Sequence, residues 1–352
     1  MALTYQAGRR IQGTAADRAE VPAISGGWKE VGRTTLGSAN QEIDVTSLPD
    51  KRYYMVLLDS HGSANTAGTI RVKYNDSTGT VYAGRWSENG GADGTYVNEL
   101  SNFIGFHSED TSPKFNVGYI ANLPSKEKLT ISHAVEQNTA GAGTAPNRSE
   151  ESAKCVETTN SISSISYKVG ATNTWNTNSE VVVLGYDPDD THTDNFWEEL
   201  ASVQGNGTST TLSSGTIPAK KYLWVQGFTG DAGGANNSAL QFNSDTGSNY
   251  ATRRNLDGGS DTTWLSQAYT QLGTNTNCFF NTFIINNSAN EKLAITHWVQ
   301  RLTAGAANAP SRGEFVGKWA NTSNQITDIT LVQQTTSINW GTDVRLKVWG
   351  SD

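Results

Sequence analysis

Two blocks of sequence occur twice in this chain of 352 residues, and the duplication limits what the chain can fold into. Residues 126–150 and 290–314 are identical at 14 of 25 positions, without a gap, at an offset of 164. Residues 74–95 and 242–263 agree at 10 of 22 positions at an offset of 168. Repeats in the same order indicate two homologous modules in tandem, and the drifting offset indicates small insertions in loops.

The start of each repeat sets the expected boundaries. Trp28-Lys-Glu corresponds to Trp197-Glu-Glu, and a polar, proline-containing stretch separates the two repeats. Each module has about 150 residues, enough to fold around its own core. We expect an N-terminal arm over residues 1–26, a first module over 27–187, a linker over 188–196 and a second module over 197–352.

Short β-branched and aromatic runs bounded by turn residues recur in both modules, as is typical of β-strands. Leu129–His133 and Leu293–His297 alternate with period two, and no long segment has helical periodicity. The pattern predicts an all-β fold of two tandem β-sandwich, jelly-roll-like modules with an N-terminal arm. The expected strands are residues 53–58, 69–74, 81–86, 115–120, 129–135, 162–169 and 181–186, then 222–228, 239–243, 250–255, 279–285, 293–300, 326–332 and 344–349, with 28–31 and 43–45 as further candidates.

Two kinds of loop are expected. Asn75–Gly79 and Asn243–Gly247 each join two strand runs, so we expect hairpin loops with glycine at a positive φ. Residues 87–112 and 229–238 are polar and differ between the halves, which favours long loops on the outward face.

Composition excludes several classes of protein. The net charge is −8, which argues against a nucleic-acid surface because phosphate binding needs clustered Lys and Arg. No apolar run approaches the ~18 residues of a membrane span, and the N-terminus has no apolar signal core, so synthesis in the cytoplasm without a signal peptide is expected. Cys155 and Cys278 fit no metal or disulfide spacing and are expected to be free thiols.

His133 and His297 are the two histidines that recur in the repeat. A metal ligand or a catalytic base is one interpretation. A structural histidine bonded to a loop backbone is the other, and it is preferred because no second His or Cys lies at ligand spacing. We expect both to lie on the strand face opposite Ile131 and Ile295, to have equivalent environments and to bind no metal.

Arg148 and Glu150 follow a Thr-Ala-Gly-Ala loop, and Arg312 and Glu314 follow the same loop in the second module. Residues after strands often carry binding functions, which makes these four candidate loop or interface residues together with the two histidines. A pair that braces the loop by a charge-assisted hydrogen bond requires the same residues and is the preferred interpretation.

The linker carries Asp187, Asp189, Asp190 and Asp194. Calcium takes six to eight oxygen ligands, so a site over residues 187–194 is conceivable. The spacing fits no calcium-binding loop, and a solvated acidic linker is the preferred interpretation. We therefore expect no cofactor.

Catalytic motifs are missing from the sequence. It contains no G-x-S-x-G, no H-E-x-x-H and no Walker loop, and we expect the protein not to be an enzyme. A glycosidase pair of carboxylates leaves no such motif, so a glycan-active enzyme stays a less favoured alternative. Trp86, Trp175 and Trp264 are candidates for stacking on sugars, although filling of a core or an interface is preferred.

Two segments resemble known sequences. The opening Met1–Gly13 followed by Trp28-Lys-Glu, and the motif Phe242–Tyr250, resemble uncharacterised virion structural proteins of marine viruses and phages. The resemblance implies a capsid or capsid-associated subunit located in the virion. Its partners would be further copies of itself, as a trimer, and other virion proteins. A tail-fibre, receptor-binding or carbohydrate-binding adhesin that takes a host surface glycan is the alternative.

The arm generates a first prediction. Tyr5, Ile11, Val21 and Ile24 could add an edge strand to a neighbouring sheet, but they are too few for a separate core. Deletion of residues 2–24 should leave both modules folded by circular dichroism and weaken assembly in sedimentation. Assembly equal to that of the full chain would refute this role.

Overall fold

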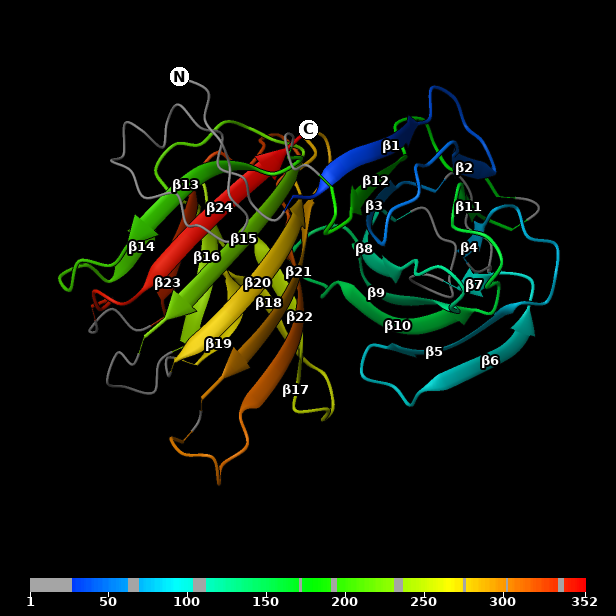
Figure 1. Cartoon of the computed structure of the whole chain (residues 1–352). Helices are drawn as coiled ribbons and strands as arrows, with labels where there is room; N and C mark the ends of the chain where they lie inside the picture. Colours follow the sequence, from blue (N-terminus) through cyan, green and yellow to red (C-terminus); the bar gives the residue numbers. More distant parts are fainter. Residues whose placement is uncertain are drawn as a thin grey trace, which may run out of the picture.

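The computed structural model describes residues 27–62, 70–103, 112–170, 173–190, 195–230, 237–274, 277–301, 303–334 and 339–352. The expected N-terminal arm, residues 1–26, lies outside the described residues. Every regular element in the described part is a β-strand, and no helix there is long and apolar enough to cross a membrane. Figure 1 shows the strands gathered into two separate modules.

Each module contains twelve named strands. In the first they are β1 (Lys29–Thr35), β2 (Glu42–Val45), β3 (Tyr53–Ser60), β4 (Arg71–Tyr74), β5 (Tyr82–Glu88), β6 (Gly94–Glu99), β7 (Asn102–Phe103), β8 (Lys114–Ala121), β9 (Lys128–Glu136), β10 (Asn147–Cys155), β11 (Ile165–Lys168) and β12 (Glu180–Tyr186). In the second they are β13 (Glu198–Gln204), β14 (Thr211–Ser213), β15 (Tyr222–Thr229), β16 (Asn237–Phe242), β17 (Tyr250–Leu256), β18 (Thr262–Gln267), β19 (Thr270–Thr274), β20 (Cys278–Ile285), β21 (Lys292–Gln300), β22 (Ser311–Trp319), β23 (Ile329–Gln333) and β24 (Arg345–Ser351).

The two modules have the same strand order. A large sheet runs β1-β12-β3-β8-β9-β10-β5-β6 and a small sheet β2-β11-β4-β7, and adding twelve to each number gives the sheets of the second module. The four strands β1-β12-β3-β8 opposite β2-β11-β4-β7 form the two sheets of a jelly roll. Two hairpins, β5-β6 and β9-β10, extend the large sheet. The prediction of two tandem jelly-roll-like sandwiches is confirmed.

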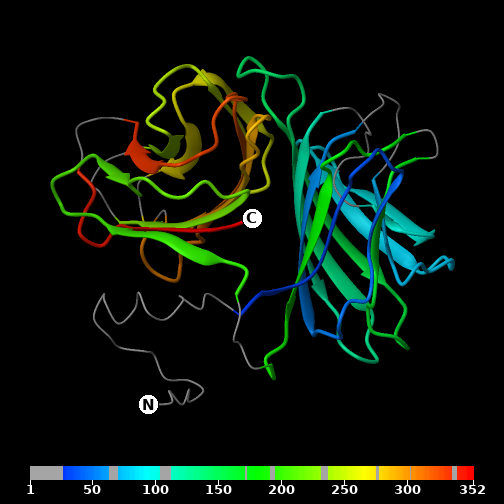
Figure 2. The same ribbon diagram turned by 90° about the horizontal axis from the view of Figure 1, so that it is seen from above.

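Three apolar clusters hold the chain together. One lies inside each sandwich, around Tyr54, Val72 and Val183 in the first module and around Leu240, Phe280 and Trp340 in the second. The third joins residues of both modules from the outer faces of the two large sheets. Figure 2 shows the modules side by side with these sheets facing each other. The members of this cluster are Met55, Leu57, Phe115, Val117, Val135, Val182, Leu184, Phe196, Trp197, Tyr222, Phe283, Ile285, Leu293, Ile295, Val316 and Trp349.

Several strands have no apolar run in the sequence. The strands β10 and β22 are rich in charged and small residues, yet each is paired on both sides in the large sheet. The expectation of one long loop over residues 87–112 is wrong, because β6 and β7 lie within it. A strand that is polar on one face is stabilised by its neighbours rather than by its own β-propensity.

The two repeated turns differ from the expected hairpins. β4 and β5 are consecutive but lie in different sheets, so the turn at Asn75 carries the chain from one sheet to the other. The positive φ angles belong to Asn75 (54°) and Asp76 (48°) rather than to Gly79. A tyrosine hydroxyl ties the turn down: Tyr82 Oη accepts a hydrogen bond from the Tyr74 amide at 2.8 Å.

The same hydroxyl bridge in the second module gives a prediction. Tyr250 Oη accepts from the Phe242 amide at 2.9 Å and donates to the Phe242 carbonyl at 3.2 Å. Tyr250→Phe leaves both buried backbone groups without that partner and should lower the free energy of unfolding by about 1–3 kcal/mol. Tyr53→Phe, on a partly exposed ring, is the control and should change it by less than about 0.5 kcal/mol. Equal urea-unfolding midpoints for the two variants would contradict this.

Candidate functional site

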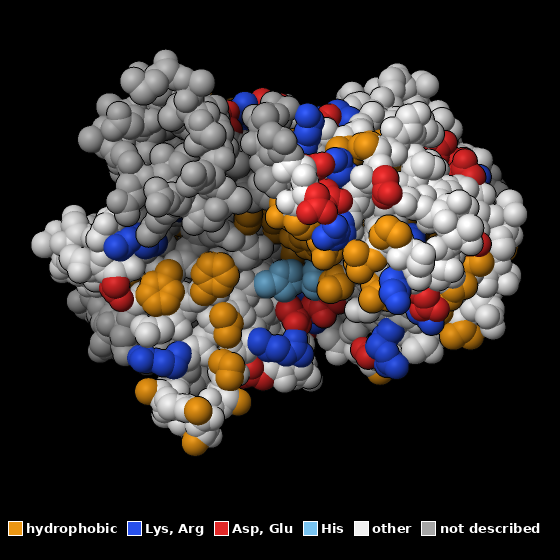
Figure 3. Space-filling view, viewed as in Figure 1, with side chains coloured by type: hydrophobic (Ala, Val, Ile, Leu, Met, Phe, Trp, Pro, Cys, Tyr) orange, Lys and Arg blue, Asp and Glu red, His pale blue; other side chains and the backbone are white. Residues whose placement is uncertain are grey.

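Five of the six residues singled out in the repeat, all but Arg312, meet between the two modules. His133 lies on β9 directly opposite Glu150 on β10, and His297 on β21 lies opposite Glu314 on β22. Arg148 and Arg312 lie two residues earlier on β10 and β22. Of the two positions considered for these residues, a loop or an interface, the loop is wrong. Figure 3 shows histidine side chains in the hollow between the modules, with acidic and basic side chains beside them.

The predicted orientation of the histidines is also wrong. Side chains two residues apart point to the same face of a strand, so Leu129, Ile131 and His133 share one face of β9. That face is the outer face of the large sheet, and it turns toward the other module. The same holds for Ile295 and His297 on β21.

Each histidine has the other as its partner. His297 Nε2 lies 3.1 Å from His133 Nδ1, and the rings are 4.1 Å apart at an interplanar angle of 66°. The preferred interpretation, a bond to a loop backbone, is therefore wrong. Burial, with the positive charge of Arg148, lowers the pKa of His133 to about 4. Burial, then His133, lowers the pKa of His297 to about 3. Two neutral rings can share one N–H···N hydrogen bond.

Arg148 links the two modules. It pairs with Glu150 in its own module, and its guanidinium lies 2.9 Å from Asp261 and 3.5 Å from Glu314 in the second. Burial and the negative charge of Glu150 raise the pKa of Glu314. Arg312 also pairs with the glutamate two residues on, Glu314, but its side chain is 58% exposed. The Arg–Glu pair thus recurs in both modules, and in the first it belongs to a buried cluster.

The polar contacts use opposite ends of the two sheets. Lys318, at the end of β22, donates hydrogen bonds to the carbonyls of Gln137 (3.0 Å) and Thr139 (2.5 Å) just after β9. It lies 3.7 Å from Glu291, and both side chains are buried. Their counterparts in the first module, Lys154 and Glu127, pair at 3.0 Å with 45% and 42% of their side chains exposed. The interface therefore uses this lysine–glutamate pair in one module only.

The apolar contacts have the same asymmetry. Leu293 and Ile295 are 1% and 3% exposed, whereas their counterparts Leu129 and Ile131 are 55% and 54% exposed. In the reverse direction Phe115 and Val135 are 1% and 0% exposed, whereas their counterparts are 47% and 42% exposed. Those counterparts are Phe279 and Val299.

One of two equivalent contacts is therefore made. The end of the outer face near Val135 in the first module covers the end near Ile295 in the second. The opposite ends stay open, and Figure 3 shows hydrophobic side chains on both sides of the hollow. We call Leu129, Ile131, Glu127 and Lys154 the free patch of the first module, and Phe279 and Val299 the free patch of the second.

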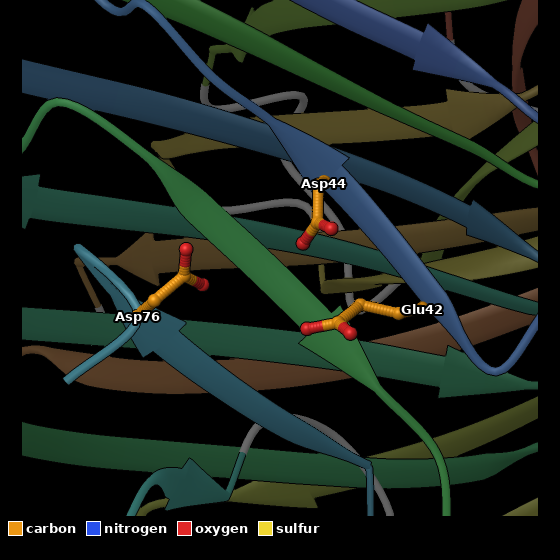
Figure 4. Close-up of side chains that lie close together, drawn as sticks. All are labelled: Glu42, Asp44 and Asp76. Carbon is orange, nitrogen blue, oxygen red and sulfur yellow. The ribbon is translucent and has the colours of Figure 1, made fainter. Parts of the chain in front are cut away.

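Three carboxylates lie close together on the first module (Figure 4). Oxygens of Glu42 and Asp44 on β2 and of Asp76 after β4 lie within 4.8 Å of one another, near enough among the described side chains to contact one ion. Burial, opposed by a hydrogen bond from Ser166, raises the pKa of Asp44. Ser166 donates to Glu42, and Lys168 Nζ lies 3.4 Å from it. The cluster is mostly exposed, and protein groups already neutralise part of its charge.

The acidic linker is neutralised by the first module. Arg52 lies 3.7 Å from Asp187 and 2.9 Å from Asp189, and Lys51 lies 2.5 Å from Asp190. Residue 194, the fourth aspartate of the conceivable calcium site, lies outside the described residues. Ion pairs with basic side chains take the oxygens that a calcium ion would need.

The three tryptophans considered for sugar stacking are not gathered on one surface. Trp175 is buried in the core of the first module. The Arg254 guanidinium lies 4.0 Å from the centre of the Trp264 ring in the second module, and Trp86 is half-buried on β5 of the first.

Comparison with known proteins adds little. No protein-family model and no curated protein matches the chain. Among solved structures, the LG1-3 region of the laminin α2 chain has a TM-score of 0.20 at 8% identity, covering 88% of this chain, which spans 64% of that one. Domains LG4-5 of mouse laminin α1 give 0.20 at 13% identity and 93% and 91% coverage. The binding domain of botulinum neurotoxin serotype D/C gives 0.16 at 10%, with 84% and 87% coverage. Similarity at this level does not indicate a shared function.

The histidine pair predicts a pH dependence. Its folded pKa values, about 4 and about 3, lie below the unfolded value of about 6.5. The unfolded chain therefore binds more protons between these values, and stability falls as the pH falls from 6.5 toward 4. Relative to a His133→Gln/His297→Gln variant, the wild type should lose about 2 kcal/mol per histidine between pH 7.5 and 5.0. Urea unfolding at both pH values measures this, and parallel profiles for the two proteins would contradict it.

Proposed function

We propose that the protein is a non-enzymatic, self-assembling structural subunit of a virus or phage particle, as a capsid or capsid-associated protein. The observation that carries the proposal is the pair of free patches. Each repeats the residues of a contact that is buried within the chain, and each is left open to solvent.

Four apolar side chains in the free patches would gain free energy from a contact between chains. Leu129, Ile131, Phe279 and Val299 are about half exposed at positions where the counterpart is buried. Burying an apolar side chain fully is worth about 1.5–3 kcal/mol. Exposed apolar patches on a monomer commonly mark association sites. A second contact of the kind already made within the chain is therefore favourable.

A second copy of the chain supplies the matching chemistry. Phe279 and Val299 of one copy would pack with Leu129 and Ile131 of the next, just as Phe115, Val135, Leu293 and Ile295 pack into one cluster within the chain. The polar groups match as well. Lys154 corresponds to Lys318, and the exposed segment 303–310 corresponds to the loop after β9 whose carbonyls Lys318 holds. A contact between two different patches builds rings or filaments.

The viral assignment rests on the resemblance of the sequence segments and on the fold class. Double-sheet jelly rolls occur in viral capsid and lectin domains, and a fold alone does not fix a function. Two similar modules in each chain would let three chains offer six similar lateral surfaces, which favours a trimer. Other virion proteins would be further partners.

The free patches give a direct test. An Ile131→Asp/Val299→Asp variant places a carboxylate in each patch. Because burying an unpaired charge is unfavourable, the association constant should fall at least tenfold. Light scattering measures this as a lower oligomer mass at the same protein concentration. Leu100→Asp, at a 47% exposed leucine outside both patches, is the matched control and should assemble like the wild type.

Two results on the state of assembly would contradict the proposal. A wild-type chain that stays monomeric at high concentration, or a double variant that assembles as well as the control, would remove its physical basis. The virion assignment is checked by mass spectrometry of purified particles. The protein should be an abundant component there, and its absence would refute that assignment.

A further inference from the structure

The first module has a pocket beside the turn that follows β4. It has a volume of about 360 Å³, within the range of small-ligand sites. Its inner wall is formed by buried residues, and its rim by the exposed turn after β4 and by residues after β10. The lining residues are Tyr74, Asn75, Asp76, Ser77, Thr78, Gly79, Lys128, Cys155, Glu157, Asn160 and Ile162.

A tryptophan occupies the equivalent place in the second module. Cys155 ends β10 and lies opposite Lys128 on β9 and Tyr82 on β5. Trp319 ends β22 and lies opposite Lys292 and Tyr250 in the same way. Cys155 and Trp319 are therefore counterparts, and the first module has a thiol where the second has an indole ring.

The contacts of the Trp319 side chain show which chemical groups surround an aromatic ring at this position. The Trp319 ring is stacked on Tyr250 with centroids 6.2 Å apart at 18°, and it meets Phe242 edge-on at 6.0 Å. Lys292 Nζ lies 6.0 Å from the ring centre. The indole N–H donates a hydrogen bond of 2.7 Å to Asp245. The site thus holds a planar ring by stacking, a cation and one acceptor.

Most of the residues that surround the Trp319 ring have counterparts in the first module, although the tryptophan itself does not. Tyr74 and Tyr82 stand for Phe242 and Tyr250, and the two ring pairs have similar separations, 6.0 and 5.9 Å. Lys128 stands for Lys292.

Each lysine is held by backbone carbonyls. Lys128 Nζ donates to Leu123 and Lys126 at 3.1 and 3.2 Å. Lys292 Nζ donates to two carbonyls at 2.8 Å. Tyr74, Tyr82 and Lys128 therefore keep the arrangement of their counterparts, and the space that the indole would fill is left as the pocket.

We propose that this pocket binds a planar aromatic group of indole size that comes from outside the chain. The ring would lie against Tyr74, as the Trp319 ring lies against Phe242, with the Lys128 ammonium beside it. An N–H on its edge would find acceptors in Ser77, the counterpart of Asp245, or in the carboxylates of Asp76 and Glu157 on the rim. The ligand is a free aromatic heterocycle or a tryptophan side chain presented by a partner, and both have this chemistry.

Binding of free indole and of N-acetyltryptophanamide, followed by saturation-transfer NMR and by thermal shift, tests the proposal. The wild type should bind indole saturably. Cys155→Trp should fill the pocket from within, abolish that binding and raise the midpoint of thermal unfolding. Cys155→Phe is the smaller filler and should weaken binding at least tenfold. Cys278→Ala, at the other buried cysteine, is the matched control and should keep it.

The reciprocal substitution tests whether the place of Trp319 in the second module can bind an indole from outside the chain. Trp319→Cys should open a second indole site in the second module, and added indole should restore part of the stability that the variant loses. Binding of N-acetyltryptophanamide as well as indole would identify a presented side chain as the ligand, and binding of indole alone a free heterocycle. No saturable binding by the wild type, or full binding by Cys155→Trp, would overturn the proposal.

Discussion

The packing of one large sheet against the other is the interaction on which the rest of the structure depends. It is a third apolar core, in which Ile295 and Val135 are as little exposed to solvent as residues inside either sandwich. It forces His133 against His297 and leaves both side chains only partly exposed, and this burial lowers the pKa of each. It also brings Arg148 within reach of Asp261 and Glu314. Because only one pair of ends closes, the same packing leaves the two free patches.

Duplication followed by divergence explains most of what differs between the modules. Lys154 and Lys318 are the same residue type at the same position, yet one lies at the surface and the other is buried beneath the loop after β9. Their sequences do not cause that difference; the placement of one module on the other does. Cys155 and Trp319 differ in the opposite sense, because there the environment is shared and the residue has changed. The first kind of difference points to assembly and the second to a ligand.

The sequence predicted the parts of the fold that local chemistry determines. Runs such as Tyr53–Ser60 and Lys128–Glu136 alternate or are continuously apolar, so their strands could be found, and the repeat required two like modules. The strand β10 could not be found because its charged residues have neighbours only in the folded sheet. The pairing of His133 with His297 depends on how two modules dock, which no local pattern encodes. The orientation of His133 could have been found, since period two places it with Ile131. The exchange of Cys155 for Trp319 was also visible at the repeat offset of 164.

The central claim is that the contact within the chain is repeated between chains. An electron cryo-microscopy structure of the assembled protein tests it most directly, because it locates the free patches in the assembly. We expect Leu129 and Ile131 of one copy to lie against Phe279 and Val299 of another, with all four side chains buried. An ordered assembly in which these four side chains remain exposed to solvent would contradict it.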